Sequence, residues 1–121
     1  MPNKILIVED NEKNMILEKD LLEIAGFEVL QANNAALGIE LAIKEKPDVI
    51  VMDVRLPDMR GTEAVKILRK NKETSDIPVV FVTASVMAEG VEEVKAIPNS
   101  SYISKPINTR TFAEEVAKAI K

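Results

Sequence analysis

Short apolar segments alternate with amphipathic segments along the chain. Five apolar runs are expected to be strands, and they span residues 4–8, 27–32, 48–52, 78–83 and 101–104. The runs that contain Ile5, Val49 and Val79 are continuously apolar and rich in Val and Ile, which is typical of strands covered on both faces. These three runs are therefore expected at the centre of a sheet.

Between these runs, apolar residues recur at the three- and four-residue spacing of one helical face. The five predicted faces are Leu17, Leu21 and Ile24; Ala36, Ile39 and Ile43; Ala64, Ile67 and Leu68; Met87, Val91 and Val94; and Phe112, Val116, Ala119 and Ile120. Asn11, Asn34 and Asn108 are predicted N-caps, and Gly26 follows the first helix. Strands that alternate with helices over short connections pair in parallel through right-handed crossovers. The pattern predicts an α/β fold of the (βα)5 type, an open parallel sheet with helices on both faces.

Length, composition and charge narrow the possible roles. The 121 residues fit one domain, residues 1–121, and 46% hydrophobic with 30% charged residues is a normal globular balance. A formal net charge of −4 argues against binding to nucleic acid. No apolar run is long enough to span a bilayer or to form a signal peptide, so no membrane association and a cytoplasmic location are expected.

The chain contains neither cysteine nor histidine. Disulfides, thiolate catalysis and Cys- or His-based metal sites are therefore excluded, together with the commonest general base. Any chemistry must depend on carboxylates, hydroxyls and lysine.

Polar residues follow four of the predicted strands. Glu9 and Asp10 follow the first, Asp53 the third, Thr83 ends the fourth, and Lys105 follows the fifth. Each has an ordinary structural explanation when taken alone: a helix cap, a turn residue, a β-former or a solvated loop lysine. The carboxyl ends of parallel strands, however, lie at one edge of the sheet, where such folds place their ligands. The coincidence favours a functional site.

Three carboxylates at one edge would repel one another, by about 4 kcal/mol for each close pair at an effective dielectric constant near 20. A cation must relieve this repulsion, and oxygen ligands without His or Cys suit Mg²⁺. An Asp beside Mg²⁺ can act as the nucleophile that forms an aspartyl-phosphate. Asp53 is the predicted nucleophile, while Lys105 and Thr83 can donate to the phosphoryl oxygens. The small Ala84 leaves an approach open.

The sequences ILIVEDN (residues 5–11), VIVMDVRLPDMRG (49–61), PVVFVTAS (78–85) and YISKP (102–106) together resemble the receiver domain of bacterial response regulators. The resemblance covers essentially the whole chain. It is strongest to single-domain receivers of the DivK type and extends to the receivers of hybrid kinases. It implies a flavodoxin-like, doubly wound sheet of five parallel strands in the order 2-1-3-4-5.

The resemblance also implies roles for the residues at this edge. Asp53 would be the phosphoacceptor, and Asp10 and Asp53 would bind Mg²⁺ directly. The main-chain carbonyl of Arg55 would be a third ligand, and Glu9 would act through a water molecule.

By the same resemblance, Thr83 and Lys105 would contact the phosphoryl group. The Lys105–Pro106 peptide bond would be cis, and Tyr102 would turn inward when Thr83 moves. One departure concerns AIPNSS (residues 96–101), where many relatives have a small residue and a glycine. Pro98 is expected to end the preceding helix early. This changes the fourth helix and the loop after it, which are part of the surface that binds targets in this family.

These features predict a signalling protein rather than an enzyme. Mg²⁺-dependent transfer of a phosphoryl group to Asp53 would switch its binding to partners. Its expected partners are a histidine kinase or a histidine phosphotransfer protein as the donor and a downstream protein target, with the chain itself monomeric. The donor is expected to contact residues on the first helix and after Lys105, namely Asn11, Asn14, Met15, Pro106, Ile107 and Asn108.

Three alternatives remain open from the sequence. The first is a receiver domain cut from a hybrid histidine kinase, which would share every motif. A phosphatase of the haloacid-dehalogenase type would need an acid/base Asp two residues after the nucleophile, where this chain has Arg55. A flavodoxin-like binding module would need a Gly-rich phosphate loop and aromatic stacking pairs, and the sequence has neither.

Overall fold

The computed structural model describes residues 3–83 and 94–120. Ala84 and the predicted helical positions Met87 and Val91 lie outside the described residues. The strands are β1 (Lys4–Val8), β2 (Glu28–Ala32), β3 (Val49–Asp53), β4 (Val79–Thr83) and β5 (Ser100–Ser104). The helices are α1 (Glu12–Ile24), α2 (Ala35–Glu45), α3 (Gly61–Lys70) and α5 (Phe112–Ala119).

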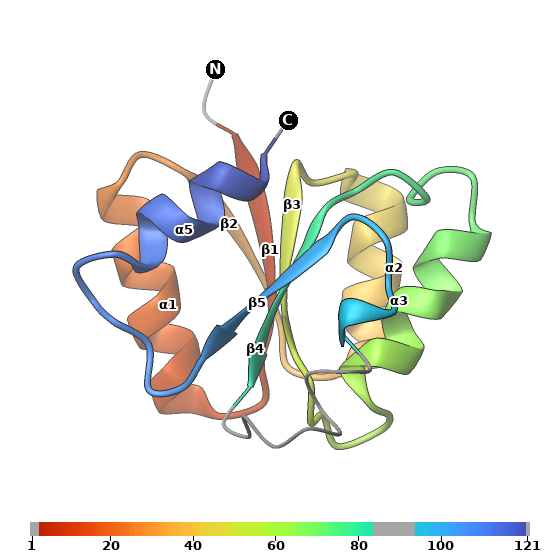
Figure 1. Ribbon diagram of the computed structural model, residues 1–121, viewed down its shortest axis with the longest axis horizontal. Coiled ribbons are helices and arrows are strands. Elements are labelled where there is room, and N and C mark those ends of the chain that lie inside the picture. The colour runs from red at the N-terminus through yellow and green to blue at the C-terminus, as the bar shows by residue number, and fades with distance from the viewer. Residues whose placement is uncertain (1–2, 84–93, 121) are drawn as a thin grey trace.

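All five strands pair in parallel in the order β2-β1-β3-β4-β5, which confirms the predicted fold. Helices α1 and α5 cover one face of the sheet, and α2 and α3 cover the other (Figure 1). The carboxyl ends of the strands lie together at the bottom of Figure 1. Within the described ranges, no helix is long and apolar enough to cross a membrane.

The sheet separates two hydrophobic cores. Alternate residues of a strand point to opposite faces, so Ile5 and Ile7 of β1 enter the core under α1 and α5, whereas Leu6 and Val8 enter the core under α2 and α3. Every residue of β3 and β4 is buried. The continuous apolar runs therefore form central strands, as predicted.

The predicted helical face of α1 is wrong at two of its three positions: Leu21 packs against the core, but Leu17 is 39% and Ile24 is 84% exposed. The buried residues of α1 are Met15, Glu18 and Leu22. The periodicity was hidden because the middle position of the true inner face is a glutamate. Only the neighbourhood of this carboxyl in the folded chain explains its burial.

The predicted face of α2 is displaced by one residue. Ala35, Gly38 and Ala42 are the buried positions, while Ile39 is only partly buried. Small residues on this side allow the helix to approach the sheet closely. A Cβ atom added at Gly38 would lie 2.7 Å from Cγ2 of Val8.

The predictions for the later helices are mostly confirmed. On α3, Ala64 and Leu68 are buried, but Ile67 is 45% exposed and Val65 takes its place in the core. On α5, Phe112 and Val116 are fully buried, and Ala119 and Ile120 pack against the same core. Val94, the described member of the fourth predicted face, is also buried.

Two of the three predicted N-caps are confirmed. The side chains of Asn11 and Asn34 accept hydrogen bonds from the N–H groups of Asn14 (3.0 Å) and Leu37 (2.8 Å). The third prediction is wrong: Asn108 accepts from Arg110 N and so closes the turn that precedes α5. Gly26 follows α1 at a φ of 99°, in the left-handed region that glycine adopts without strain.

Candidate functional site

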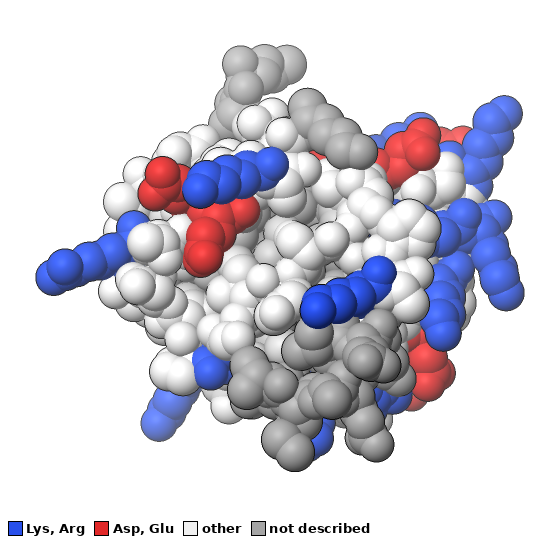
Figure 2. Space-filling view, in the orientation of Figure 1, with Lys and Arg blue, Asp and Glu red and all other residues white. Residues whose placement is uncertain are grey.

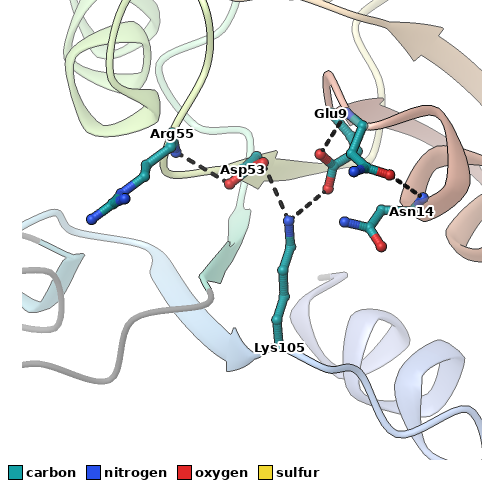
Figure 3. Close-up of polar contacts among 6 residues, drawn as sticks. Glu9, Asn14, Asp53, Arg55 and Lys105 are labelled. Atoms are coloured by element: carbon teal, nitrogen blue, oxygen red, sulfur yellow. Dashed lines mark hydrogen bonds and ion pairs between the residues drawn. The ribbon is translucent and has the colours of Figure 1, made fainter.

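An ion-paired cluster lies at the carboxyl ends of β1, β3 and β5. The Lys105 ammonium lies 2.9 Å from Oε1 of Glu9 and 3.3 Å from Oδ2 of Asp53 (Figure 3). The side chains of Glu9 and Asp53 are only 1% and 10% exposed, and that of Lys105 is 18% exposed. The fold thus brings together residues that are as many as 96 positions apart in the sequence.

Asp10 completes an acidic cluster with Glu9 and Asp53. One carboxylate oxygen from each residue lies within 4.8 Å of the other two. Asp10 is exposed and the other two are buried, so the cluster opens to solvent on one side. A set of three carboxylates without nitrogen or sulfur ligands fits a hard divalent cation such as Mg²⁺.

The loop that follows β3 is folded tightly against Asp53. Arg55 N donates to Oδ1 of Asp53 at 3.1 Å, and the Arg55 side chain points away from the cluster (Figure 3). Gly61 N donates to Val54 O at 2.8 Å. A Cβ atom at Gly61 would lie 2.1 Å from the backbone oxygen of Asp53, so only glycine fits this return of the chain.

Thr83 and Lys105 are joined through the backbone. Lys105 N donates to Thr83 O at 2.8 Å, and the Lys105–Pro106 bond is cis, as predicted. Thr83 is 4% exposed and ends β4 beside the strand that carries Asp53. Tyr102 lies on β5 opposite Phe81 and is 39% exposed, so it points outward in this structure.

The electrostatic environment shifts the ionisation of all three paired groups. Burial, followed by the hydrogen bond and the charge of Glu9, raises the pKa of Asp53 to about 6. Burial alone would raise the pKa of Glu9, but hydrogen bonds with Lys105, Asp53 and Asn11 together lower it. Burial opposes the charge of Lys105, yet its bonds to Glu9 and Asp53 raise its pKa. Asp53 therefore takes up a proton more readily than an ordinary aspartate as the pH falls, whereas Glu9 stays ionised to lower pH.

Sequence reasoning missed Glu18. This α1 residue is 2% exposed and interacts with Glu9, Lys105 and Asp53. Burial and then the charge of Glu9 raise the pKa of Glu18 to about 8. The available signal was that Met15, Glu18 and Leu22 share one helical face, with a charged residue between two apolar ones.

The residues predicted to contact a phosphoryl donor lie around the cluster. Asn14, Pro106 and Ile107 line a pocket of about 320 Å³ together with Leu17, Glu18 and Lys105. Asn11 and Asn108 are exposed. Met15 is 7% exposed, and it both belongs to the core and lines a groove beside Glu9 and Asp10.

Comparisons with known proteins all lead to one family. A family model described as the response regulator receiver domain matches residues 5–117. The polar-differentiation response regulator DivK of Brucella anthropi is 40% identical over 116 residues, which cover 96% of this chain and 94% of the relative.

Solved structures show the same fold. The chemotaxis response regulator CheY4 of Vibrio cholerae superposes with a TM-score of 0.92 at 28% identity, over 99% of this chain and all of the other. A CheY-like receiver domain protein from Methanospirillum hungatei JF-1 gives a TM-score of 0.89 at 29% identity, over 98% of this chain and 93% of the other.

Proposed function

Because the chain belongs to the family of response regulator receiver domains, which act in two-component signalling, we propose that Asp53 is its phosphoacceptor. The observation that carries the proposal is the position of this side chain. Asp53 ends β3 almost fully buried, beside a lysine ammonium at 3.3 Å and within an open acidic cluster. Once a metal ion is bound, the Asp53 carboxylate lies between two cations, the Lys105 ammonium and the metal ion.

In the proposed reaction, a carboxylate oxygen of Asp53 forms a bond to phosphorus while the bond between phosphorus and the donor breaks. The product is an acyl phosphate on Asp53. Lys105 donates hydrogen bonds to the phosphoryl oxygens, and the Thr83 hydroxyl donates to the same oxygens after a change of rotamer. Both groups stabilise the negative charge of the phosphoryl oxygens, which the Asp53 carboxylate alone cannot do.

We infer that Asp10 and Asp53 bind Mg²⁺ directly, with the main-chain carbonyl of Arg55 as a third protein ligand and Glu9 acting through water. The clustered carboxylate oxygens of Glu9, Asp10 and Asp53 support the carboxylate part of this set. When bound, the ion neutralises the repulsion between the carboxylate nucleophile and the incoming phosphoryl group.

The phosphoryl donor must lie on another protein or domain if it is a phosphohistidine, since this chain has no histidine. We infer a histidine kinase or a histidine phosphotransfer protein that docks on the pocket between α1 and the segment after β5. Its imidazole would approach Asp53 from the open side of the site.

Phosphorylation is inferred to change the surface around β5 through Thr83 and Tyr102. The phosphoryl group adds negative charge and acceptor oxygens that favour one of two arrangements of Thr83. Figure 2 shows few charged side chains over the centre of this face, and β5 itself has the uncharged sequence SSYIS. An uncharged, partly polar face suits a downstream protein that binds one state and releases the other.

We infer a signalling role without substrate turnover rather than a phosphatase. The position two residues after Asp53 is Arg55, and its side chain points away from the site (Figure 3). It provides no carboxyl group to act as a general acid.

Acetyl phosphate tests the proposal because it needs no docking protein. With Mg²⁺, the wild-type chain should gain the mass of one phosphoryl group, and Asp53→Asn should gain none while staying folded. Asp20→Asn, an exposed change on α1, is the matched control and should be labelled normally. Mass gain by Asp53→Asn, or no gain by the wild type, would refute the proposal.

A further inference from the structure

The N-terminus of α2 is capped from two sides. The first turn of a helix leaves several N–H groups without intrahelical acceptors. Asn34 accepts from Leu37 N at 2.8 Å, within the same turn. Asp58, which lies in the loop between β3 and α3, accepts from Ala35 N at 2.8 Å and from Ala36 N at 2.9 Å, one with each carboxylate oxygen.

The Asp58 contact crosses more than 20 residues and is therefore a tertiary link. These two backbone hydrogen bonds lower the pKa of Asp58, which stays ionised at neutral pH. Negative charge is also favourable at the positive end of a helix. The contact fixes α2 and the loop with respect to each other.

The same loop begins directly after Asp53 and contains Arg55. Within the loop, Gly61 N donates to Val54 O and Arg55 pairs with Arg60, and at its start Val54 N donates to Val82 O of β4 at 3.3 Å. Asp58 ties the loop to a helix that packs on the sheet through Ala35, Gly38 and Ala42. The position of the Arg55 backbone thus depends on α2 as well as on the turns within the loop.

We propose that Asp58 is a positioning residue for the metal site: its two hydrogen bonds to the start of α2 hold the loop so that the Arg55 carbonyl stays at the acidic cluster. The inference rests on the proposed function, because it assumes that Mg²⁺ binds there. Asp58 itself does not bind the ion. Removing a partner that orients a metal ligand typically weakens metal binding by about tenfold or more.

The test measures Mg²⁺ dissociation constants by titration of amide NMR shifts on the full chain. Asp58→Ala should raise the dissociation constant by about tenfold. Asp58→Asn, which keeps one acceptor oxygen, should give a smaller increase. Asn34→Ala is the matched control: it removes a cap from the same helix turn without touching the loop, and it should leave the dissociation constant unchanged.

The outcomes separate this inference from the proposed function. If the wild type binds Mg²⁺ and Asp58→Ala binds it equally well or more tightly, Asp58 has no positioning role. If Asp58→Ala and Asn34→Ala weaken binding to the same extent, the site responds only to the stability of α2, and the inference is again wrong. If the wild type itself binds no Mg²⁺ at millimolar concentration, the proposed metal site and this inference fail together.

Discussion

The ammonium nitrogen of Lys105 lies 3.3 Å from a carboxylate oxygen of Asp53. The same nitrogen lies 2.9 Å from Glu9, so one cation serves two buried carboxylates in the free protein. Any phosphoryl group that reaches Asp53 must take over part of this ion pairing. The lysine is therefore a structural partner before phosphorylation and a phosphate ligand after it, under the proposed mechanism.

Lys105→Met should destabilise the protein in the absence of divalent cations. Two buried carboxylates would lose the ammonium that pairs with them, which costs about 3–5 kcal/mol in the free energy of unfolding. Added Mg²⁺ should recover part of this loss, because a ligand that binds only the folded state stabilises it. Urea denaturation with EDTA and with Mg²⁺ measures both effects.

Lys66→Met, a change of an exposed lysine on α3, is the control for that experiment and should alter stability little. A Lys105→Met variant as stable as the wild type in EDTA would show that the ion pairs of Lys105 make no net contribution to the free energy of unfolding.

Binding of Mg²⁺ should weaken as the pH falls through about 6, the pKa of Asp53. Carboxylate ligands must be ionised to bind the metal, and at pH 5 only about a tenth of Asp53 would be ionised, which predicts a dissociation constant about tenfold higher than at pH 8. Asp10→Asn should bind more weakly at both pH values, because it lacks one anionic ligand. Equal affinity of the wild type at pH 5 and pH 8 would contradict the assignment of Asp53 as a ligand.

Glu18 should make the protein less stable in alkaline solution. Its pKa is raised from 4.5 to about 8, so between these values the folded state holds a proton that the unfolded state has lost. The free energy of unfolding therefore falls as the pH rises from about 4.5 to 8, by about 5 kcal/mol at full effect. Glu18→Gln should remove most of this loss.

The measurement is urea denaturation of both proteins at pH 5 and pH 9 in EDTA. The variant should be the more stable protein at pH 9 and similar to the wild type at pH 5. Asp20→Asn, an exposed change on the same helix, should follow the wild type at both values. Parallel pH profiles for Glu18→Gln and the wild type would show that Glu18 ionises normally.

Charge introduced at the pocket between α1 and the segment after β5 should slow phosphoryl transfer from the donor protein. It should not slow the reaction of Asp53 with a small phosphoryl donor. Asn14 and Ile107 both line this pocket. The double variant Asn14→Glu with Ile107→Glu should receive phosphoryl groups from its kinase at least tenfold more slowly, because exposed charges change partner choice. Labelling by acetyl phosphate should be nearly unchanged. Equal losses with both donors would mean that the substitutions damaged the site itself.

The sequence by itself determined the order and type of the elements and the edge where the site lies. Continuous apolar runs such as those of β3 and β4 are typical of central strands, and alternation with helices permits few topologies. Polar residues at the strand ends then had to meet, because parallel strands all end at the same edge. Glu9, Asp53 and Lys105 were therefore predictable as neighbours.

Only the tertiary structure decided which helix faces turn inward and which remote polar groups pair. The inner face of α1 contains Glu18, whose pKa depends on Glu9 and Lys105 from other segments, and no local pattern carries that information. The link from Asp58 to the start of α2 likewise depends on how closely two loops approach. Hydrophobic periodicity records how much apolar surface a segment buries, whereas the pairing of polar groups is set by distances that exist only after the chain has folded.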